Sequence, residues 1–220
     1  GAQIIDINMG CPAKKVCAVA AGSALMGQEK LALDIIDAVV QALANRREPI
    51  PVTVKMRTGI CDSKLNAPHL ALAMEALGVS MIVVHGRTRE QGFQGCAEYE
   101  TIRQVKQAVS IPVVANGDID SAAKARQVLD QTGCDAVMVG RAAMGRPWLF
   151  AQIATELTGQ PAMADPSLDD VREAMFDHFE DHINFYGEAS GVRSIRKHVA
   201  WYLPQWASLS GLQQVNGLLL

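Results

Sequence analysis

Short runs rich in valine and isoleucine alternate with longer helix-like stretches, and this alternation constrains the fold more than any other feature of the chain. Each run is almost continuously apolar, which is typical of a parallel strand buried on both faces. The runs start at intervals of roughly 23 to 48 residues, the rhythm of βα units. The five predicted strands are Gln3–Asn8, Pro51–Met56, Ser80–His85, Ile111–Asn116 and Cys134–Gly140.

Stretches with apolar residues at helical spacing separate the strands, and such a series builds either an open doubly wound sheet or a (β/α)8 barrel. Every predicted strand ends in a polar or glycine-containing motif. In a barrel the carboxyl ends of all strands form one active face, whereas an open sheet concentrates such motifs near a switch point. We therefore predict an α/β fold of the TIM-barrel type. The predicted helices are Ala18–Ala44, Pro68–Leu77, Tyr99–Val109 and Ala122–Gln131.

Five βα units are visible, whereas a closed barrel needs eight. The chain starts without a methionine and enters a strand-like run within three residues, so we expect that the first strands of the barrel are missing. We predict a partial barrel over residues 1–158, a linker with two prolines over 159–166 and an incomplete helical domain over 167–220. Ser167 is the predicted N-cap of the first helix of that domain, and Pro204 is predicted to end its helical part.

Composition excludes several classes of protein. Of the 220 residues 49% are hydrophobic, enough for a sizeable core, and the net charge of -3 excludes a generically basic nucleic-acid binder but not a local basic patch. No apolar run reaches the length of about 18 residues that a membrane span needs. Five cysteines at irregular spacing favour a reducing, cytoplasmic location over a disulfide scaffold, and the absence of any zinc-type Cys/His spacing predicts that no metal is bound.

Glycine-containing motifs follow the last two predicted strands. They are Asn116-Gly117-Asp118 and Gly140-Arg141. Barrels frequently bind phosphate at these two strand ends, with main-chain N–H groups and the start of a short helix. The glycines allow close approach of the backbone, and the arginine supplies charge. We therefore favour a phosphate site over simple tight turns at these positions.

Paired basic residues mark the ends of the second and third predicted strands. Lys55 and Arg57 stand two residues apart, so their side chains point to the same side of the strand. Two cations on a buried strand end are costly unless an anion or an electron-rich ligand meets them. His85 and Arg87 repeat the pattern on the next strand. One such pair could be a core salt bridge, but two at adjacent strand ends favour a ligand site.

A cysteine follows the first predicted strand directly. Cys11 lies between Gly10 and Pro12, and a thiol there can be an acid, a nucleophile, a metal ligand or a buried structural group. The residue pattern alone leaves these alternatives open. The other four cysteines are predicted to be structural, and they are Cys17, Cys61, Cys96 and Cys134.

A basic patch stands out in the otherwise acidic helical tail. Arg193, Arg196 and Lys197 are spaced by three and four residues, which places them on one face of a helix. Such a face is either a solvated charged surface or a contact for phosphate groups.

Taken together, the strand-end motifs resemble those of the tRNA-dihydrouridine synthases, most closely the bacterial B type. The resemblance covers roughly residues 1 to 206, in order and at family-like spacing. The segment from Gly191 to Tyr202 is similar to the C-terminal helical domain of that family. The matching motifs are Asn8-Met9-Gly10-Cys11-Pro12, Lys55-Met56-Arg57-Thr58-Gly59, His85-Gly86-Arg87-Thr88, Asn116-Gly117-Asp118 and Gly140-Arg141.

The resemblance implies a barrel that uses FMN, with NADPH as the electron donor, to reduce a uridine of the tRNA D-loop, U17 for the B type. It implies transfer of a hydride from the flavin to C6 of the uracil and of a proton from Cys11 to C5. The residues implied to bind the cofactor are Lys55, His85, Asn116, Gly117, Asp118, Gly140 and Arg141. Those implied to contact the substrate are Asn8, Arg57, Arg87, Arg193, Arg196 and Lys197.

Two other functions remain open from the sequence. The chain could be another FMN barrel acting on a small pyrimidine, or a catalytically inactive tRNA-binding fragment. The basic helical tail favours the tRNA enzyme over the first of these, because a small substrate needs no RNA-docking domain. A partial barrel predicts weak flavin binding for the chain alone. The sequence does not fix the oligomeric state.

Overall fold

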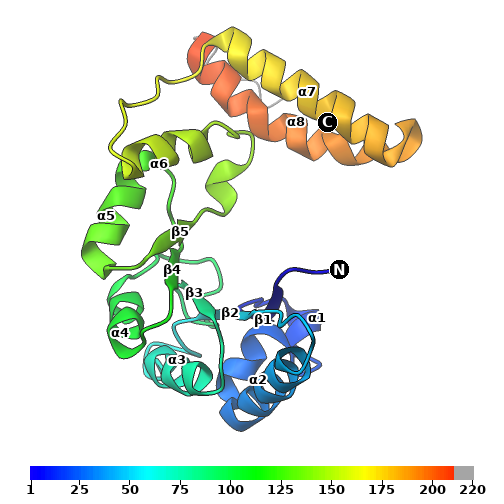
Figure 1. Cartoon of the computed structure of the whole chain (residues 1–220). Coiled ribbons are helices and arrows are strands. Elements are labelled where there is room, and N and C mark those ends of the chain that lie inside the picture. The colour runs from blue at the N-terminus through cyan, green and yellow to red at the C-terminus, as the bar shows by residue number, and fades with distance from the viewer. Residues whose placement is uncertain (211–220) are drawn as a thin grey trace. The chain divides into compact units, whose positions relative to one another are not determined.

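The computed structural model describes residues 1–210 of the chain. Five strands form one sheet in the order β1-β2-β3-β4-β5, and each neighbouring pair is parallel (Figure 1). All five predicted strands are confirmed, with ends displaced by at most two residues. The strands are β1 (Ile5–Met9), β2 (Val52–Arg57), β3 (Met81–His85), β4 (Val113–Asn116) and β5 (Ala136–Met138).

The strand order distinguishes the two architectures that the sequence allowed. A doubly wound sheet reverses its strand order at a switch point, whereas a barrel adds each new strand beside the last. The described strands follow the chain without reversal, so they have the α/β arrangement of neighbouring strands in a barrel.

The two faces of the sheet have different chemistry. Residues in register on neighbouring strands point to the same face, and the face alternates along each strand. One face presents fully buried apolar side chains, among them Val54, Met56, Ile82, Val84, Val113 and Ala115. The other face presents polar side chains toward the carboxyl ends of the strands, namely Asp6, Asn8, Lys55, Arg57, His85 and Asn116.

The first and last strands differ from the prediction of strands buried on both faces. In β1 the exposed side chains of Asp6 and Asn8 alternate with those of less exposed residues, and β5 is only partly buried. The prediction was wrong for these two strands because they form the edges of the described sheet, where only one neighbouring strand covers them.

Ten helical segments accompany the strands in the described residues. The predicted single helix Ala18–Ala44 is wrong: Gly22, which adopts a φ of +58°, opens a separate 3-10 segment, and the long helix begins only at Glu29. The segments are α1 (Lys14–Cys17), η1 (Gly22–Gly27), α2 (Glu29–Ala44), α3 (Ala67–Ala76), α4 (Glu100–Ala108), α5 (Ala122–Thr132), η2 (Arg141–Ala143), α6 (Leu149–Leu157), α7 (Leu168–Tyr186) and α8 (Glu188–Ser210). Helices α2, α3 and α4 lie along one side of the sheet (Figure 1).

The chain divides into two compact units. The first contains Gly1–Ile119 and Lys124–Val139, and the second contains Asp120–Ala123 and the chain from Gly140 onward. Residues 159–166, the predicted linker, contain neither helix nor strand. The predicted domain boundaries stay predictions, and residues 211–220 of the predicted helical domain lie outside the described part of the chain.

The second unit ends in two helices, α7 and α8, that pack side by side (Figure 1). Ser167 is confirmed as the N-cap of α7, since its hydroxyl accepts from the Asp170 N–H while the Asp170 carboxylate accepts from the Ser167 N–H. The predicted end of the helical part at Pro204 is wrong, because α8 continues to Ser210. Proline has no N–H to donate, but its φ is compatible with helical backbone. Within residues 1–210 no helix has the length and apolarity to cross a membrane.

Candidate active site

A tight loop carries Cys11 at the carboxyl end of β1. The side-chain oxygen of Asn8 accepts hydrogen bonds from the main-chain N–H groups of Gly10 and Cys11, at 2.9 and 3.0 Å. From the other side, the Arg57 Nε donates to the carbonyl oxygen of Gly10 at 2.7 Å. Two side chains on neighbouring strands therefore fix the backbone that presents the Cys11 thiol, which is half-buried.

Lys55 and Asn116 meet across the polar face of the sheet. The Lys55 Nζ donates to the Asn116 side-chain oxygen at 3.0 Å, and the Asn116 amide nitrogen donates to the carbonyl of Met138 at 2.8 Å. Burial lowers the pKa of Lys55, Arg57 lowers it further, and Asp6 opposes the shift. The ammonium therefore lies in a region of excess positive charge, which an anionic or electron-rich ligand would stabilise.

Arg57 is almost fully buried, with 1% of its surface exposed. Its Nη1 donates to the carbonyl oxygens of Thr88 and Gly92, both at 2.8 Å, in addition to the bond from Nε to Gly10. Phe93 lies with its ring centroid 5.7 Å from the guanidinium carbon. Backbone carbonyls therefore stabilise the buried guanidinium charge of Arg57, for which the sequence pattern predicted a bound ligand. The predicted contact between Arg57 and substrate stays a prediction.

Arg87 joins the loop after β3 to the loop after β4. Its guanidinium is buried and donates to the carbonyls of Gln94 and Gly95, and its Nη2 forms an ion pair with the Asp118 carboxylate at 2.7 Å. Asp118 also accepts from the N–H of Ala97 at 2.7 Å. The structure therefore uses Arg87 to organise these loops, and its predicted contact with substrate stays a prediction.

His85 lies among these cations and is buried, with its Nε2 at 3.4 Å from the Arg87 Nη1. Burial, reinforced by the positive charges of Arg57, Lys55 and Arg87, lowers the pKa of His85 to about 3. The ring is therefore neutral at physiological pH, so it can accept one hydrogen bond and donate another.

The backbone after β4 has an unusual conformation. Gly117 has a φ of +119° and Asp118 a φ of +49°, and a Cβ on Gly117 would lie 2.8 Å from that of Ala97 and 2.9 Å from the His85 ring. The Tyr99 hydroxyl donates to the Gly117 carbonyl at 2.8 Å. A glycine is required here by both conformation and space.

A family model described as "Dihydrouridine synthase (Dus)" matches residues 1–216 of the chain. The chain belongs to this family. The resemblance read from the strand-end motifs is thereby confirmed.

Bacterial members of the family align with most of the chain. It is 54% identical over 203 residues to tRNA-dihydrouridine synthase B of Xanthomonas axonopodis, covering 92% of this chain and 59% of that protein. It is 53% identical to the protein of the same name from Pseudomonas aeruginosa, covering 97% of this chain and 62% of that protein. The chain therefore spans about three-fifths of the length of these relatives.

A solved structure of phosphonopyruvate hydrolase in complex with oxalate and Mg++ is similar in fold, with a TM-score of 0.50 and 16% sequence identity. The match covers 98% of this chain and 78% of that one. At this identity the likeness concerns the fold alone. The shared fold agrees with a parallel α/β sheet whose five described strands follow the chain in order.

The remaining predicted residues of this Dus-family chain lie in the second unit. Gly140 precedes the short helix η2, which begins at Arg141. Arg193, Arg196 and Lys197 lie on α8, and all three are exposed. The first unit thus brings together Asn8, Cys11, Lys55, Arg57, His85, Arg87, Asn116, Gly117 and Asp118, while the roles of the second-unit residues stay predictions.

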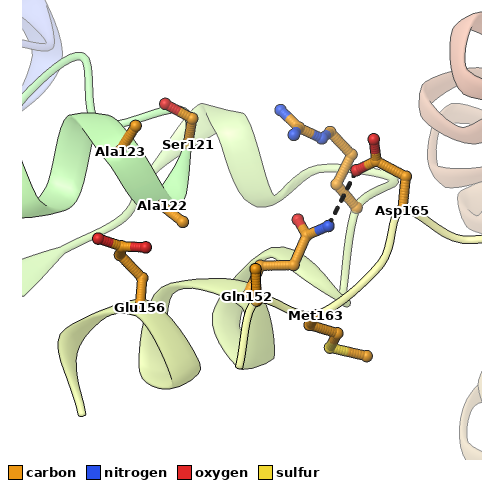
Figure 2. A pocket seen from close by; sticks show the side chains of 9 residues that line it. Ser121, Ala122, Ala123, Gln152, Glu156, Met163 and Asp165 are labelled. Carbon is orange, nitrogen blue, oxygen red and sulfur yellow. Dashed lines mark hydrogen bonds between the residues drawn. The ribbon is translucent and has the colours of Figure 1, made fainter. Parts of the chain in front are cut away.

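The second unit also contains an open pocket of about 270 Å³ at the start of α5 (Figure 2). Ser121, Gln152 and Asp165 are among its lining residues, and the Gln152 side-chain nitrogen donates to the Asp165 carboxylate at 3.1 Å. None of the site residues predicted from the sequence lines this pocket. In the described residues, no group of three or more His, Cys, Asp or Glu side chains is arranged to hold a metal ion.

Sequence reasoning missed the groups that support the site. Thr53 donates to the Asp6 carboxylate at 2.7 Å, and Tyr99 holds Gly117. The sequence could have indicated Asp6, because it stands two residues before Asn8 on the same strand and its side chain therefore lies on the same face of the sheet. Tyr99 had none, because its partner is a backbone carbonyl 18 residues away.

Proposed function

We propose that the chain carries the catalytic half of a tRNA-dihydrouridine synthase that uses FMN to reduce a uridine of the tRNA D-loop to 5,6-dihydrouridine. The names of its relatives and its family support this activity. The observation that carries the proposal is the polar face of the sheet, where Cys11, Lys55, His85 and Asn116 gather at the carboxyl ends of the strands. The resemblance of the strand-end motifs to the B type implies U17 as the proposed target.

The chemistry of the donor set fits a flavin. Lys55 is half-buried and its pKa is lowered by burial and by Arg57, so a ligand that carries negative charge relieves the unfavourable field. His85 is neutral and offers both a donor and an acceptor to a polar ring system. Because the two loops of the predicted phosphate site lie in different units, the contribution of Gly140 and Arg141 is a proposal based on the family.

In this proposal Lys55, His85 and Asn116 hold the flavin ring, and Gly117, Asp118, Gly140 and Arg141 form the loops around its phosphate. Held by these residues, a reduced flavin would supply hydride chemistry for C6 of the uracil. Lys55 stabilises negative charge at the cofactor, and the bond to Asn116 at 3.0 Å orients its ammonium. Asp118 acts on the loop rather than on the phosphate, because its carboxylate is bonded to Arg87 and Ala97.

Cys11 is the proposed acid that donates a proton to C5 of the uracil. A thiol carries an S–H proton that a positioned acid can transfer to a reacting carbon. Asn8 and Arg57 hold the loop on both sides of Gly10, which fixes the position of the thiol relative to the sheet.

The exposed cations of α8 are the proposed tRNA contact of the second unit. Arg193, Arg196 and Lys197 lie on one helical face and are free of burial costs. NADPH is the proposed electron donor, as the family resemblance implies.

The proposal is tested by loading the purified protein with FMN, adding NADPH and tRNA that lacks dihydrouridine, and mapping the product by position. We expect dihydrouridine at position 17. A protein that oxidises NADPH and reduces free pyrimidines but leaves tRNA unchanged would contradict the proposal and favour a small-molecule barrel enzyme. A protein that binds tRNA but retains no flavin would favour a binding function.

A further inference from the structure

Two thiols lie on the same small loop of the first unit. Cys17 ends α1, and its Sγ lies 3.6 Å from the carbonyl oxygen of Cys11 and 3.5 Å from the hydroxyl of Ser23. Both cysteines are half-buried, so a small oxidant can reach them. The catalytic proposal gives a role to Cys11 and none to Cys17.

The backbone packs these two residues tightly. The Ser23 N–H donates to the Cys11 carbonyl at 2.9 Å. A Cβ on Gly22 would lie 2.7 Å from that oxygen, 3.2 Å from the Cys11 Cβ and 2.9 Å from the Val16 side chain. Glycine at this position therefore allows the turn after α1 to pack directly against Cys11.

Arg57 lies close to both cysteines. Burial and the charge of Arg87 lower the pKa of Arg57, and negative charge on the sulfur of Cys11 or Cys17 opposes this shift. Both sulfurs thus lie within the electrostatic reach of one guanidinium, which also holds the Gly10 carbonyl.

The other cysteines differ in their surroundings. Cys134 is buried, and burial raises the pKa of its thiol, which makes it a poor nucleophile. Cys61 lies beside Ser63, with 3.3 Å between sulfur and oxygen, and Cys96 is exposed. The pairing of a proposed catalytic thiol with a second, accessible thiol is therefore found at Cys11 and Cys17.

We propose that Cys11 and Cys17 form a reversible disulfide that switches off the enzyme under oxidation by a hydroperoxide. The Cys11 sulfur takes one oxygen from the hydroperoxide and becomes a sulfenic acid, while the hydroperoxide is reduced to an alcohol or water. The Cys17 sulfur then attacks that sulfur, an S–S bond forms, and water leaves with the oxygen. Two thiols lose their hydrogens in total, and the hydroperoxide gains two electrons.

Disulfide formation requires the two side chains to rotate toward one another. The Cys17 thiol gives up a weak contact with the Cys11 carbonyl and turns toward the Cys11 sulfur about its χ1 bond. A disulfide across so short a loop, with α1 inside it, is strained, and strained disulfides are the readily reduced ones. The expected loss of activity rests on the proposed function, because the disulfide removes the proton that Cys11 would donate. Formation of the disulfide does not depend on the proposed function.

The test treats the 220-residue chain with hydrogen peroxide and maps its peptides without reduction. We expect a peptide that joins Cys11 to Cys17, which dithiothreitol separates again. Cys17→Ser removes the cross-linked peptide, whereas Cys96→Ser, at an exposed loop position, leaves it in place. Absence of the cross-linked peptide in the parent protein, or a disulfide from Cys11 to a different cysteine in its place, would overturn the proposal.

Activity gives the second readout. We expect peroxide to lower dihydrouridine formation by at least about tenfold, since loss of a positioned acid costs about 10²–10⁴-fold, and dithiothreitol to restore it in the parent. In Cys17→Ser the untreated activity remains. Without the second thiol, the sulfenic acid of Cys11 is oxidised further by excess peroxide to a sulfinic acid, and dithiothreitol does not restore that part of the lost activity. If the cross-link forms but the reduced protein never yields dihydrouridine, the disulfide stands and the proposed function fails.

Discussion

The side-chain oxygen of Asn8 accepts a hydrogen bond of 3.0 Å from the main-chain N–H of Cys11, and a second, of 2.9 Å, from that of Gly10. The Asn8 side chain therefore acts on the loop that carries the thiol, through its oxygen. The family resemblance implied a contact between Asn8 and substrate, which would use its amide nitrogen as well. The two roles can be separated by substitution.

We predict that Asn8→Asp retains most activity, because a carboxylate accepts from both N–H groups, whereas Asn8→Ala loses about 100-fold in kcat, the cost of a catalytic group misplaced by about 1 Å. Steady-state kinetics of dihydrouridine formation measures both. Equal losses in the two variants would show that the amide nitrogen is the essential group.

A second prediction concerns Asp118. Asp118→Ala leaves the buried Arg87 guanidinium without its carboxylate partner and should lower the free energy of unfolding by about 1–3 kcal/mol. The loss stays below that of a fully buried pair, because the Asp118 side chain is 32% exposed. Urea unfolding measures it. Glu100→Ala, which removes the exposed ion pair with Arg103, is the matched control and should change the midpoint little.

Much of the fold could be predicted from the sequence, because β-branched runs identify buried parallel strands wherever neighbours cover both faces. That argument fails at β1, which is an edge strand of the described sheet. The rule that proline ends a helix fails at Pro204, because α8 continues to Ser210. Both errors have the same cause, because the local sequence pattern does not show which other segments pack against a strand or helix.

The sequence predicted which side chains lie in the site, but it did not predict their hydrogen-bond partners. Lys55 and His85 could be placed at strand ends, since period-two alternation gives the face of each side chain. The partners of Arg57 are backbone carbonyls of Gly10, Thr88 and Gly92, which any residue carries. No sequence signal exists for such partners, so a structural arginine resembled a ligand-binding one.

A third prediction concerns acid sensitivity. The pKa of His85 falls from 6.5 to about 3 in the folded protein, so between these pH values the unfolded chain binds a proton that the native protein does not. Native stability from this residue is therefore fully present above pH 6.5 and is lost as the pH falls toward 3. His85→Gln should show a shallower decline of unfolding free energy over this range, measured by urea unfolding at several pH values. The exposed His69→Gln is the control. Parallel curves for parent and His85→Gln would contradict a depressed pKa.

A fourth prediction concerns the basic face of α8. Charge reversal at Arg196 and Lys197 should weaken tRNA binding and leave flavin content unchanged. For each tRNA phosphate that the variant no longer binds, the slope of log affinity against log salt should fall by about 0.9 or somewhat less. Charge reversal at the exposed Arg46 and Arg47 changes the net charge by the same amount and is the control. An unchanged slope would identify the patch as a solvated surface.

The central claim is that Cys11 donates the proton to the uracil of tRNA, and a single-turnover experiment with Cys11→Ala tests it most directly. The variant protein is loaded with FMN, reduced with NADPH and mixed with tRNA that lacks dihydrouridine, while flavin absorbance and dihydrouridine are followed together. We predict normal flavin content and normal reduction by NADPH, with dihydrouridine formation slowed by about 10²–10⁴-fold. Dihydrouridine formed by the variant at the parent rate would contradict the claim.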